Sequence, residues 1–183
     1  MSMLLIRHGL TRSNLEHRYI GCRTEEPLCE TGIAALKNGH YPPVSRVLIS
    51  PMLRCRQTAA ILYPALSPEV VDDFRECDFG RFEGKSYDEL NGNPDYQAWI
   101  DSGGTLPFPG GESREMFIAR CVRAFENVAG LWARDTAVIA HGGTLMAIMQ
   151  SHARPRQDYF DYQVKNGQGF RLFSDGRWEK LYF

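Results

Sequence analysis

Residues 3–14, with the sequence MLLIRHGLTRSN, decide the fold that the rest of the chain must adopt. The apolar run 3–6 is short, branched and uninterrupted, which is typical of a central strand covered on both faces. It stops at an Arg-His-Gly turn, so the strand is predicted to deliver a cation and His8 to one edge of a sheet. Thr11 or Ser13 can cap a helix after this turn, and we expect the first N–H groups of that helix to face a phosphate beside His8.

A second stretch of the chain has the same form. Residues 136–140 (TAVIA) make an apolar strand, and His141, Gly142 and Gly143 follow it before a helical pattern. Ligand sites in open α/β sheets gather at the carboxyl ends of the strands. The two strand ends are therefore predicted to bring the imidazoles of His8 and His141 together.

Length and composition place the chain among ordinary globular proteins. It has 183 residues, a formal net charge of −1 and 43% hydrophobic residues, so one domain over residues 1–183 is expected. The charge balance does not indicate a nucleic-acid partner, and no apolar run approaches the length of a membrane span. No signal peptide is recognisable, so a cytoplasmic location is expected. The five cysteines are scattered and odd in number, which indicates reduced thiols, most of them in packing roles.

Hydrophobic periodicity and turn residues predict the other elements. Further strands are expected at residues 46–50 and 69–71, with a C-terminal hairpin formed by residues 170–173 and 178–183. Helices are expected at residues 32–38 with Thr31 as cap, 51–63 with Pro51 in the first turn, 86–90, 94–100, from Ser113 onward, and 144–152. The clearest apolar stripe lies on the helix after Ser113 and comprises Phe117, Cys121, Ala124, Phe125, Val128 and Trp132.

Two charged stretches of the sequence lie next to the predicted strands and helices. Arg54 and Arg56 lie two residues apart on a predicted helix, so they leave it in different directions and at most one of them faces the site. Residues 72–84 are acidic, aromatic and broken by glycine, and are predicted to form a loop or a tight hairpin.

Five motifs in succession give the chain a family resemblance. They are Leu5-Ile6-Arg7-His8-Gly9-x-Thr11-x-x-Asn14, Ser50-Pro51-x-Leu53-Arg54-x-Arg56-Gln57-Thr58-Ala59, Glu76-x-x-x-Gly80-x-x-Glu83-Gly84, Pro109-Gly110-Gly111-Glu112-Ser113 and Ala140-His141-Gly142-Gly143. This order and separation resemble the histidine phosphatase superfamily, in its phosphoglycerate-mutase-like branch. The resemblance implies an α/β fold, a three-layer α/β/α sandwich with a mostly parallel central sheet.

The chemistry of these positions can be reasoned from the residue types. A phosphomonoester needs cations to spread its negative charge, a neutral nucleophile behind phosphorus and an acid for the departing oxygen. His8 can attack through one ring nitrogen while the other donates to a backbone carbonyl, and nearby Arg7 and Arg54 would depress its pKa. The two arginines offer forked donors to the phosphoryl oxygens, and His141 adds a further donor.

The proton donor is less sharply defined by the residues alone. Glu76, Asp78 and Glu83 are all candidates, and the surrounding acids could raise the pKa of one of them, although Arg75 and Arg81 oppose this effect. The resemblance assigns the role to Glu76.

Other residues are predicted to complete the site. Asn14 and Gly142 are expected to bind the phosphoryl group together with Arg7, Arg54 and His141. Thr11, Tyr96, Trp99 and Phe108 are expected to contact the rest of the substrate. No His or Cys pair has metal-ligand spacing, so neither a metal nor another cofactor is expected.

The segment 87–111 would form a lid beside the leaving group. Its aromatic side chains and few cations favour a leaving group with an apolar or aromatic part over one with a second phosphate. Within the family the pattern looks most like α-ribazole phosphatases, which act on a benzimidazole nucleotide, although broad-specificity phosphatases share much of it.

The sequence therefore predicts a phosphatase acting on a small phosphomonoester through a phosphohistidine. Two alternatives stay open, a phosphoglycerate mutase and a catalytically silent relative that binds a phosphorylated ligand. The short stretch between Glu76 and His141 argues against a mutase, which by resemblance would carry inserted segments here. The oligomeric state is not predicted.

Overall fold

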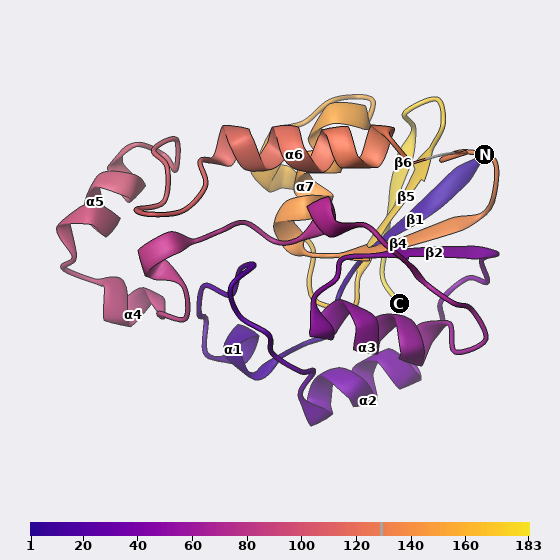
Figure 1. The fold of residues 1–183 in the computed structure, drawn as a ribbon. Helices are drawn as coiled ribbons and strands as arrows, with labels where there is room; N and C mark the ends of the chain where they lie inside the picture. Colours follow the sequence, from indigo (N-terminus) through magenta and orange to yellow (C-terminus); the bar gives the residue numbers. More distant parts are fainter. Residues whose placement is uncertain (129) are drawn as a thin grey trace.

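A mixed β-sheet forms the centre of the computed structural model, which describes residues 1–128 and 130–183 (Figure 1). Within the described residues the sheet has six strands in the order β3-β2-β4-β1-β5-β6. Their bounds are Ser2–Arg7 for β1, Arg46–Ile49 for β2, Glu69–Val70 for β3, Thr136–Ala140 for β4, Gly169–Phe173 for β5 and Trp178–Leu181 for β6.

The strand directions confirm the predicted mostly parallel sheet. β1 and β2 both run parallel to β4, which lies between them, and β3 runs parallel to β2. β5 pairs antiparallel with both β1 and β6, so the predicted C-terminal hairpin is also present. The carboxyl ends of β2, β4 and β1 consequently meet at one edge of the sheet.

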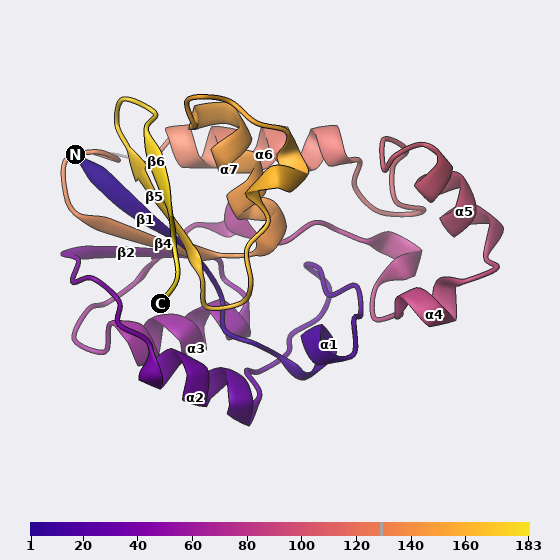
Figure 2. The same cartoon turned by 180° about the vertical axis from the view of Figure 1, so that it is seen from behind.

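Helices cover both faces of this sheet and extend beyond its edge (Figures 1 and 2). The helices are α1 (Arg12–Leu15), α2 (Glu30–Asn38), α3 (Leu53–Leu62), α4 (Tyr87–Leu90), α5 (Pro94–Asp101), α6 (Arg114–Glu126) and α7 (Gly142–His152), with 3-10 turns η1 (Asp72–Phe74), η2 (Gly80–Phe82) and η3 (Tyr159–Tyr162). α6 and α7 lie on one face and α2 and α3 on the other, which confirms the three-layer arrangement. α4 and α5 stand apart from the layers.

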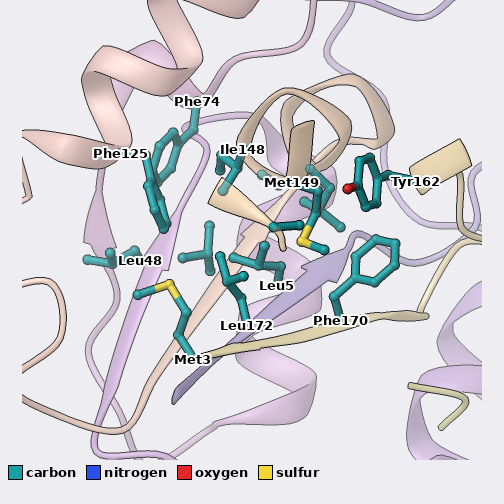
Figure 3. Packing of buried hydrophobic residues seen from close by; sticks show 14 of the residues in the cluster. Met3, Leu5, Leu48, Phe74, Phe125, Ile148, Met149, Tyr162, Phe170 and Leu172 are labelled. Carbon is teal, nitrogen blue, oxygen red and sulfur yellow. The ribbon is translucent and has the colours of Figure 1, made fainter. Parts of the chain in front are cut away.

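The position of β1 in the sheet explains why residues 3–6 include no polar residue. Met3 and Leu5 pack on the side of α6 and α7, in a cluster that includes Phe125 (Figure 3). Leu4 and Ile6 point to the opposite face, in a cluster that includes residues of α3. Because both faces are covered, every side chain from residue 3 to residue 6 is buried.

Several element boundaries differ from the predicted ones because the caps differ. Cys29, not Thr31, is the N-cap of α2, so this helix starts two residues before its predicted start. Met52 precedes the first residue of α3, which leaves Pro51 outside the helix. α7 also begins two residues early, with His141 at its N-cap position.

The C-terminal part of the predicted apolar stripe lies outside the helix. α6 ends at Glu126, so Val128 and Trp132 follow it, yet both pack against the same buried cluster as Phe125. The stripe is therefore core, as predicted, although only its first part is helical.

The segment 72–84 is a loop with two 3-10 turns, η1 and η2, and not a hairpin. It leads into α4 and α5, whose apolar side chains form a separate cluster with Phe82, Phe108 and Phe117. The segment 87–111 thus has its own small core, which extends to the face of α6.

Two further properties concern the whole of the described chain. None of the helices within residues 1–128 and 130–183 is long and apolar enough to cross a membrane. All five cysteines are free thiols, and Cys55, Cys77 and Cys121 are buried.

Replacing Phe125 tests the core between α6 and the sheet. Phe125→Ala should lower the free energy of unfolding by about 3–5 kcal/mol, because a fully buried ring is replaced by a cavity. Met116→Ala on the same helix is the control, since Met116 is 64% exposed and its loss should change stability by less than about 0.5 kcal/mol. Urea unfolding followed by circular dichroism measures both, and equal effects would contradict the assigned packing.

Candidate active site

Three neighbouring strands deliver polar side chains to one edge of the sheet. Ser50 follows β2, His141 follows β4 and His8 follows β1. Main-chain hydrogen bonds fix these residues side by side, since the His8 N–H donates to Ala140 O at 2.9 Å and the Ser50 N–H donates to Ile139 O at 3.0 Å. The rings of His8 and His141 lie edge to face with centroids 5.2 Å apart, so the predicted meeting of two imidazoles is confirmed.

The His8 imidazole is held with one nitrogen free. Its Nδ1 lies 2.7 Å from Gly9 O, and because a carbonyl only accepts, Nδ1 carries the proton and donates it. Nε2 therefore keeps its lone pair. Burial, and then the charges of Arg54 and Arg7, hold the pKa of His8 well below its usual value, so the ring is neutral at pH 7.

Two arginines with buried guanidinium atoms stand beside this ring. Arg54 is 1% exposed, and its Nη1 and Nη2 donate to the carbonyls of Thr24 and Gly21 at 3.0 Å each. Arg7 donates from Nη1 to Val164 O at 2.8 Å. Arg56 donates instead to Pro51 O, just before α3, at 2.7 Å, so only one of the two arginines faces the site, as the two-residue spacing predicted.

Buried side-chain nitrogens without partners lie near His8. Arg7 Nε, Arg54 Nε and His141 Nδ1 are all shielded from solvent, and none has a hydrogen-bond partner among the described residues. A buried polar group left unpaired costs about 1–3 kcal/mol, so such groups in a folded protein indicate a missing partner. Their shared chemistry fits an anion bound next to Nε2 of His8.

His141 contributes a neutral ring to this cluster. Its Nε2 lies 2.7 Å from Ser50 Oγ and 3.7 Å from Cys55 Sγ. Burial, and then the charge of Arg54, place the pKa of His141 well below its usual value. The ring therefore offers its hydrogen bonds without adding a charge.

Glu76 is a buried carboxyl on the other side of the site. Its oxygens accept from the N–H groups of Cys77 at 3.0 Å and Gly143 at 3.2 Å. Burial raises the pKa of Glu76 in spite of these two hydrogen bonds and of the charges of Arg54 and Arg7, which act in the opposite direction.

The predicted cause of this raised pKa is wrong. Neighbouring acids were expected to act on Glu76, but Asp78 pairs with Arg23 at 2.7 Å, and Glu83 accepts from the Gly21 N–H at 2.9 Å. The opposing cations are also engaged elsewhere, because Arg75 pairs with Asp72 and Arg81 pairs with Asp95. Desolvation decides the pKa, and it depends on residues distant in the sequence.

Gly143 lets the Glu76 carboxyl approach the start of α7. A Cβ at this position would overlap Glu76 Oε1 and would lie 2.9 Å from the Phe117 ring. The hydroxyl of Tyr159 donates to Gly143 O at 3.3 Å, which adds a residue that sequence reasoning missed. No local pattern around Tyr159 signals this contact.

The start of α1 differs from its predicted role. Thr11 caps the helix by accepting from the Asn14 N–H at 3.3 Å, and the Asn14 side chain accepts in return from the Thr11 N–H at 3.2 Å. The Ser13 N–H donates to Glu26 at 3.0 Å. The expectation that these N–H groups face a phosphate is therefore wrong, because side chains within the protein already occupy them.

A cavity of about 290 Å³ opens over the reactive groups. Its polar side includes Arg7, His8, Asn14, Arg18, Glu76, Arg114, Gly142 and Gln163. Arg54 and His141 are outside its described lining. Its apolar wall includes Tyr19, Ile20, Phe79, Trp99, Phe108, Phe117, Met146, Tyr159 and Phe160.

Two of the four predicted substrate contacts lie on this wall. Trp99 and Phe108 stack on one another with centroids 4.9 Å apart and line the cavity. Tyr96 and Thr11 are absent from its described lining. Tyr96 stacks on Trp99 with ring centroids 6.3 Å apart, and its hydroxyl lies 3.4 Å from that of Tyr19.

Within the described parts of the chain, no group of three or more His, Cys, Asp or Glu side chains is placed to hold a metal ion. Arg7 and Arg54 place positive charge beside His8, and Arg18 and Arg114 add charge to the cavity lining.

The family follows from the match to a family model. The model of the histidine phosphatase superfamily (branch 1) matches residues 3–179, so the chain belongs to this superfamily.

Two individual relatives are 30% and 25% identical to this chain. The bifunctional protein Rv2228c of Mycobacterium tuberculosis is 30% identical over 184 residues, which cover 94% of this chain and 47% of that protein. The chain thus spans about half the length of this mycobacterial relative. The adenosylcobalamin/alpha-ribazole phosphatase of Salmonella typhimurium is 25% identical over 177 residues, covering 91% of this chain and 87% of that protein.

Solved structures share the fold. TTHB049 from Thermus thermophilus superposes with a TM-score of 0.78 at 28% identity, covering 100% of this chain and 99% of that chain. The alpha-ribazole phosphatase from Shigella flexneri reaches a TM-score of 0.84 at 21% identity, over 99% and 95% of the two chains. At that identity the second likeness concerns the fold alone.

The raised pKa of Glu76 predicts how the rate of ester hydrolysis depends on pH. If Glu76 acts as an acid, the rate on phosphate esters with poor leaving groups should be highest below that pKa. It should fall as pH rises through a value above the usual 4.5, because the carboxyl then loses its proton. Glu76→Gln should lower this rate by about 10²-fold and remove the falling limb.

p-Nitrophenyl phosphate is the matched control substrate, since its leaving group needs little protonation and should lose much less rate. The measurement is the pH profile of kcat/KM for wild type and variant on both esters. An unchanged limb in Glu76→Gln would assign the acid to another residue.

Proposed function

We propose that this chain is a phosphomonoesterase that works through a phosphohistidine at His8 without a metal ion. The observation that carries the proposal is the set of three buried, unpartnered nitrogens, Arg7 Nε, Arg54 Nε and His141 Nδ1, beside a neutral imidazole with a free Nε2. The two arginine nitrogens are donors, and His141 Nδ1 is a third when it carries the ring proton. A phosphoryl dianion would satisfy those donors, and the same donors would stabilise the charge that its oxygens carry during transfer.

The first step forms a bond from Nε2 of His8 to phosphorus and breaks the bond from phosphorus to the ester oxygen. The protonated Glu76 gives its proton to that departing oxygen, so an alcohol leaves instead of an alkoxide. Burial of the carboxyl keeps this proton available at a higher pH than an exposed glutamate would allow.

The second step returns the enzyme to its starting state. Water attacks the phosphorus of the phosphohistidine, the Nε2–P bond breaks, and the Glu76 carboxylate takes a proton from the water as phosphate forms. Arg7 and Arg54 stay in place through both steps, because main-chain carbonyls hold their guanidinium groups.

The cavity wall supports a leaving group with an aromatic part. Trp99 and Phe108 offer a stacked pair of rings on the apolar side, where a planar group can pack. We propose α-ribazole 5'-phosphate as the substrate, which would place the enzyme in assembly of the cobalamin lower ligand. Likeness to the Salmonella adenosylcobalamin/alpha-ribazole phosphatase supports this choice.

Removing the nucleophile tests the mechanism. His8→Ala should lower phosphate release by at least about 10³-fold while the fold persists, because the neighbouring groups only stabilise charge. Wild-type enzyme quenched during turnover should carry a phosphoryl label that acid removes and base does not. A chelator should leave the rate unchanged, and orthovanadate should inhibit. Label on a carboxylate, or an obligatory metal ion, would contradict the mechanism.

A substrate panel tests the proposed specificity. Release of phosphate should be compared for α-ribazole 5'-phosphate, a sugar phosphate, 3-phosphoglycerate and 2,3-bisphosphoglycerate. We expect kcat/KM for the aromatic ester to exceed that for the bisphosphate by about tenfold or more, since the stacked rings of Trp99 and Phe108 favour a planar leaving group. Arg18 and Arg114 also line the cavity, but Arg18 is already paired with Glu16 and Glu89.

Trp99→Leu should reduce this preference, whereas Ile100→Ala should not, because Ile100 is exposed and lies outside the described cavity lining. Preference for the phosphoglycerates, or phosphoryl transfer between them, would favour a mutase. Binding of these compounds without turnover would favour a silent relative.

A further inference from the structure

Ser50 is a fully buried hydroxyl that the mechanism above does not use. It follows the last residue of β2, and its N–H donates to Ile139 O of the neighbouring β4 at 3.0 Å. This main-chain bond sets Ser50 beside His141, which follows β4. Ser50 Oγ lies 2.7 Å from His141 Nε2, a short hydrogen bond.

The other contact of the hydroxyl leaves its proton free for this bond. The Met52 N–H points to Ser50 Oγ at 3.4 Å, so the oxygen accepts from the main chain. This contact uses one of the two lone pairs of the oxygen and leaves the hydroxyl proton free, and His141 Nε2 lies at hydrogen-bond distance to accept it. With its Nε2 lone pair used in this way, a neutral His141 carries its proton on Nδ1.

Nδ1 is the atom of His141 that is buried without a partner in the described structure. It belongs to the same set as Arg7 Nε and Arg54 Nε, which surround the proposed phosphoryl site. A proton on Nδ1 makes this atom a third donor to an anion. A lone pair there would repel the anion.

We propose that Ser50 is a positioning residue, whose hydroxyl donates to Nε2 of His141 and so holds the ring in the tautomer that presents Nδ1–H to the transferring phosphoryl group. The inference rests on the proposed function, because it assumes that a phosphoryl group occupies the site. It adds a residue outside the reacting set, one that acts through the His141 ring.

Cys55 provides a matched control. Its Sγ lies 3.7 Å from the same Nε2 and is equally buried, but a thiol is a weak donor at that distance. Cys55→Ala removes a neighbour of the same nitrogen and keeps the Ser50 hydroxyl in the protein.

The tautomer of His141 can be observed directly. Wild-type protein labelled with ¹⁵N at histidine is bound to orthovanadate, and the side-chain nitrogens are recorded by NMR. Nδ1 of His141 should appear protonated and Nε2 unprotonated, and Ser50→Ala should shift this signature toward a mixture of the two tautomers. A proton on Nε2 in the wild-type complex would overturn the proposal, whatever the variants do.

Kinetics provide the second readout. Ser50→Ala should lower kcat by at least about 10-fold with a smaller change in KM, since removing a partner that orients a functional histidine has this order of effect. Ser50→Thr should recover part of the loss because it restores the hydroxyl, and Cys55→Ala should stay within about 2-fold of wild type. Equal losses in Ser50→Ala and Cys55→Ala would contradict the specific role of the hydroxyl.

The two proposals fail in different ways. If the wild type releases no phosphate from any ester, the proposed function fails, but the NMR experiment with vanadate still reports the His141 tautomer. If the wild type is active and Nε2 of His141 carries the proton, the proposed function is supported and the proposed role of Ser50 is refuted.

Discussion

Burial of two arginine guanidinium groups beside a neutral imidazole is the constraint on which the rest of the structure depends. A buried cation is costly unless hydrogen bonds replace its water. Arg54 obtains them from the carbonyls of Thr24 and Gly21, so the loop after α1 must fold over α3. Arg7 obtains one from Val164, which ties the segment before β5 to the end of β1. The segments that surround the site are therefore those whose carbonyl groups accept hydrogen bonds from Arg7 and Arg54.

The parts of this arrangement that the sequence predicted are those with a local signal. Apolar runs ending in His-Gly marked two parallel strands, and the geometry of such sheets requires their carboxyl ends to meet. Helical spacing was enough to separate Arg54 from Arg56. The motif resemblance added Glu76, which from the residues alone had rivals.

The parts that the sequence did not predict depend on contacts between distant segments. Thr11 was expected to meet the substrate, but its side chain closes a capping pair with Asn14. The pKa of Glu76 is raised by burial under residues far along the chain, not by the acids beside it. Tyr159 reaches Gly143 from a turn that has no recognisable motif. A local sequence pattern does not indicate which atoms lose contact with water when the chain folds.

The separation between the catalytic edge of the sheet and the segment 87–111 has an evolutionary consequence. The proposed phosphoryl-binding residues come from β1, α1, α3 and the junction of β4 with α7, whereas Trp99 and Phe108 belong to a segment with its own aromatic cluster. Substitutions in that segment can exchange one leaving-group preference for another while the reacting groups keep their places. Selection can therefore diversify the metabolites that such a scaffold accepts without rebuilding its chemistry.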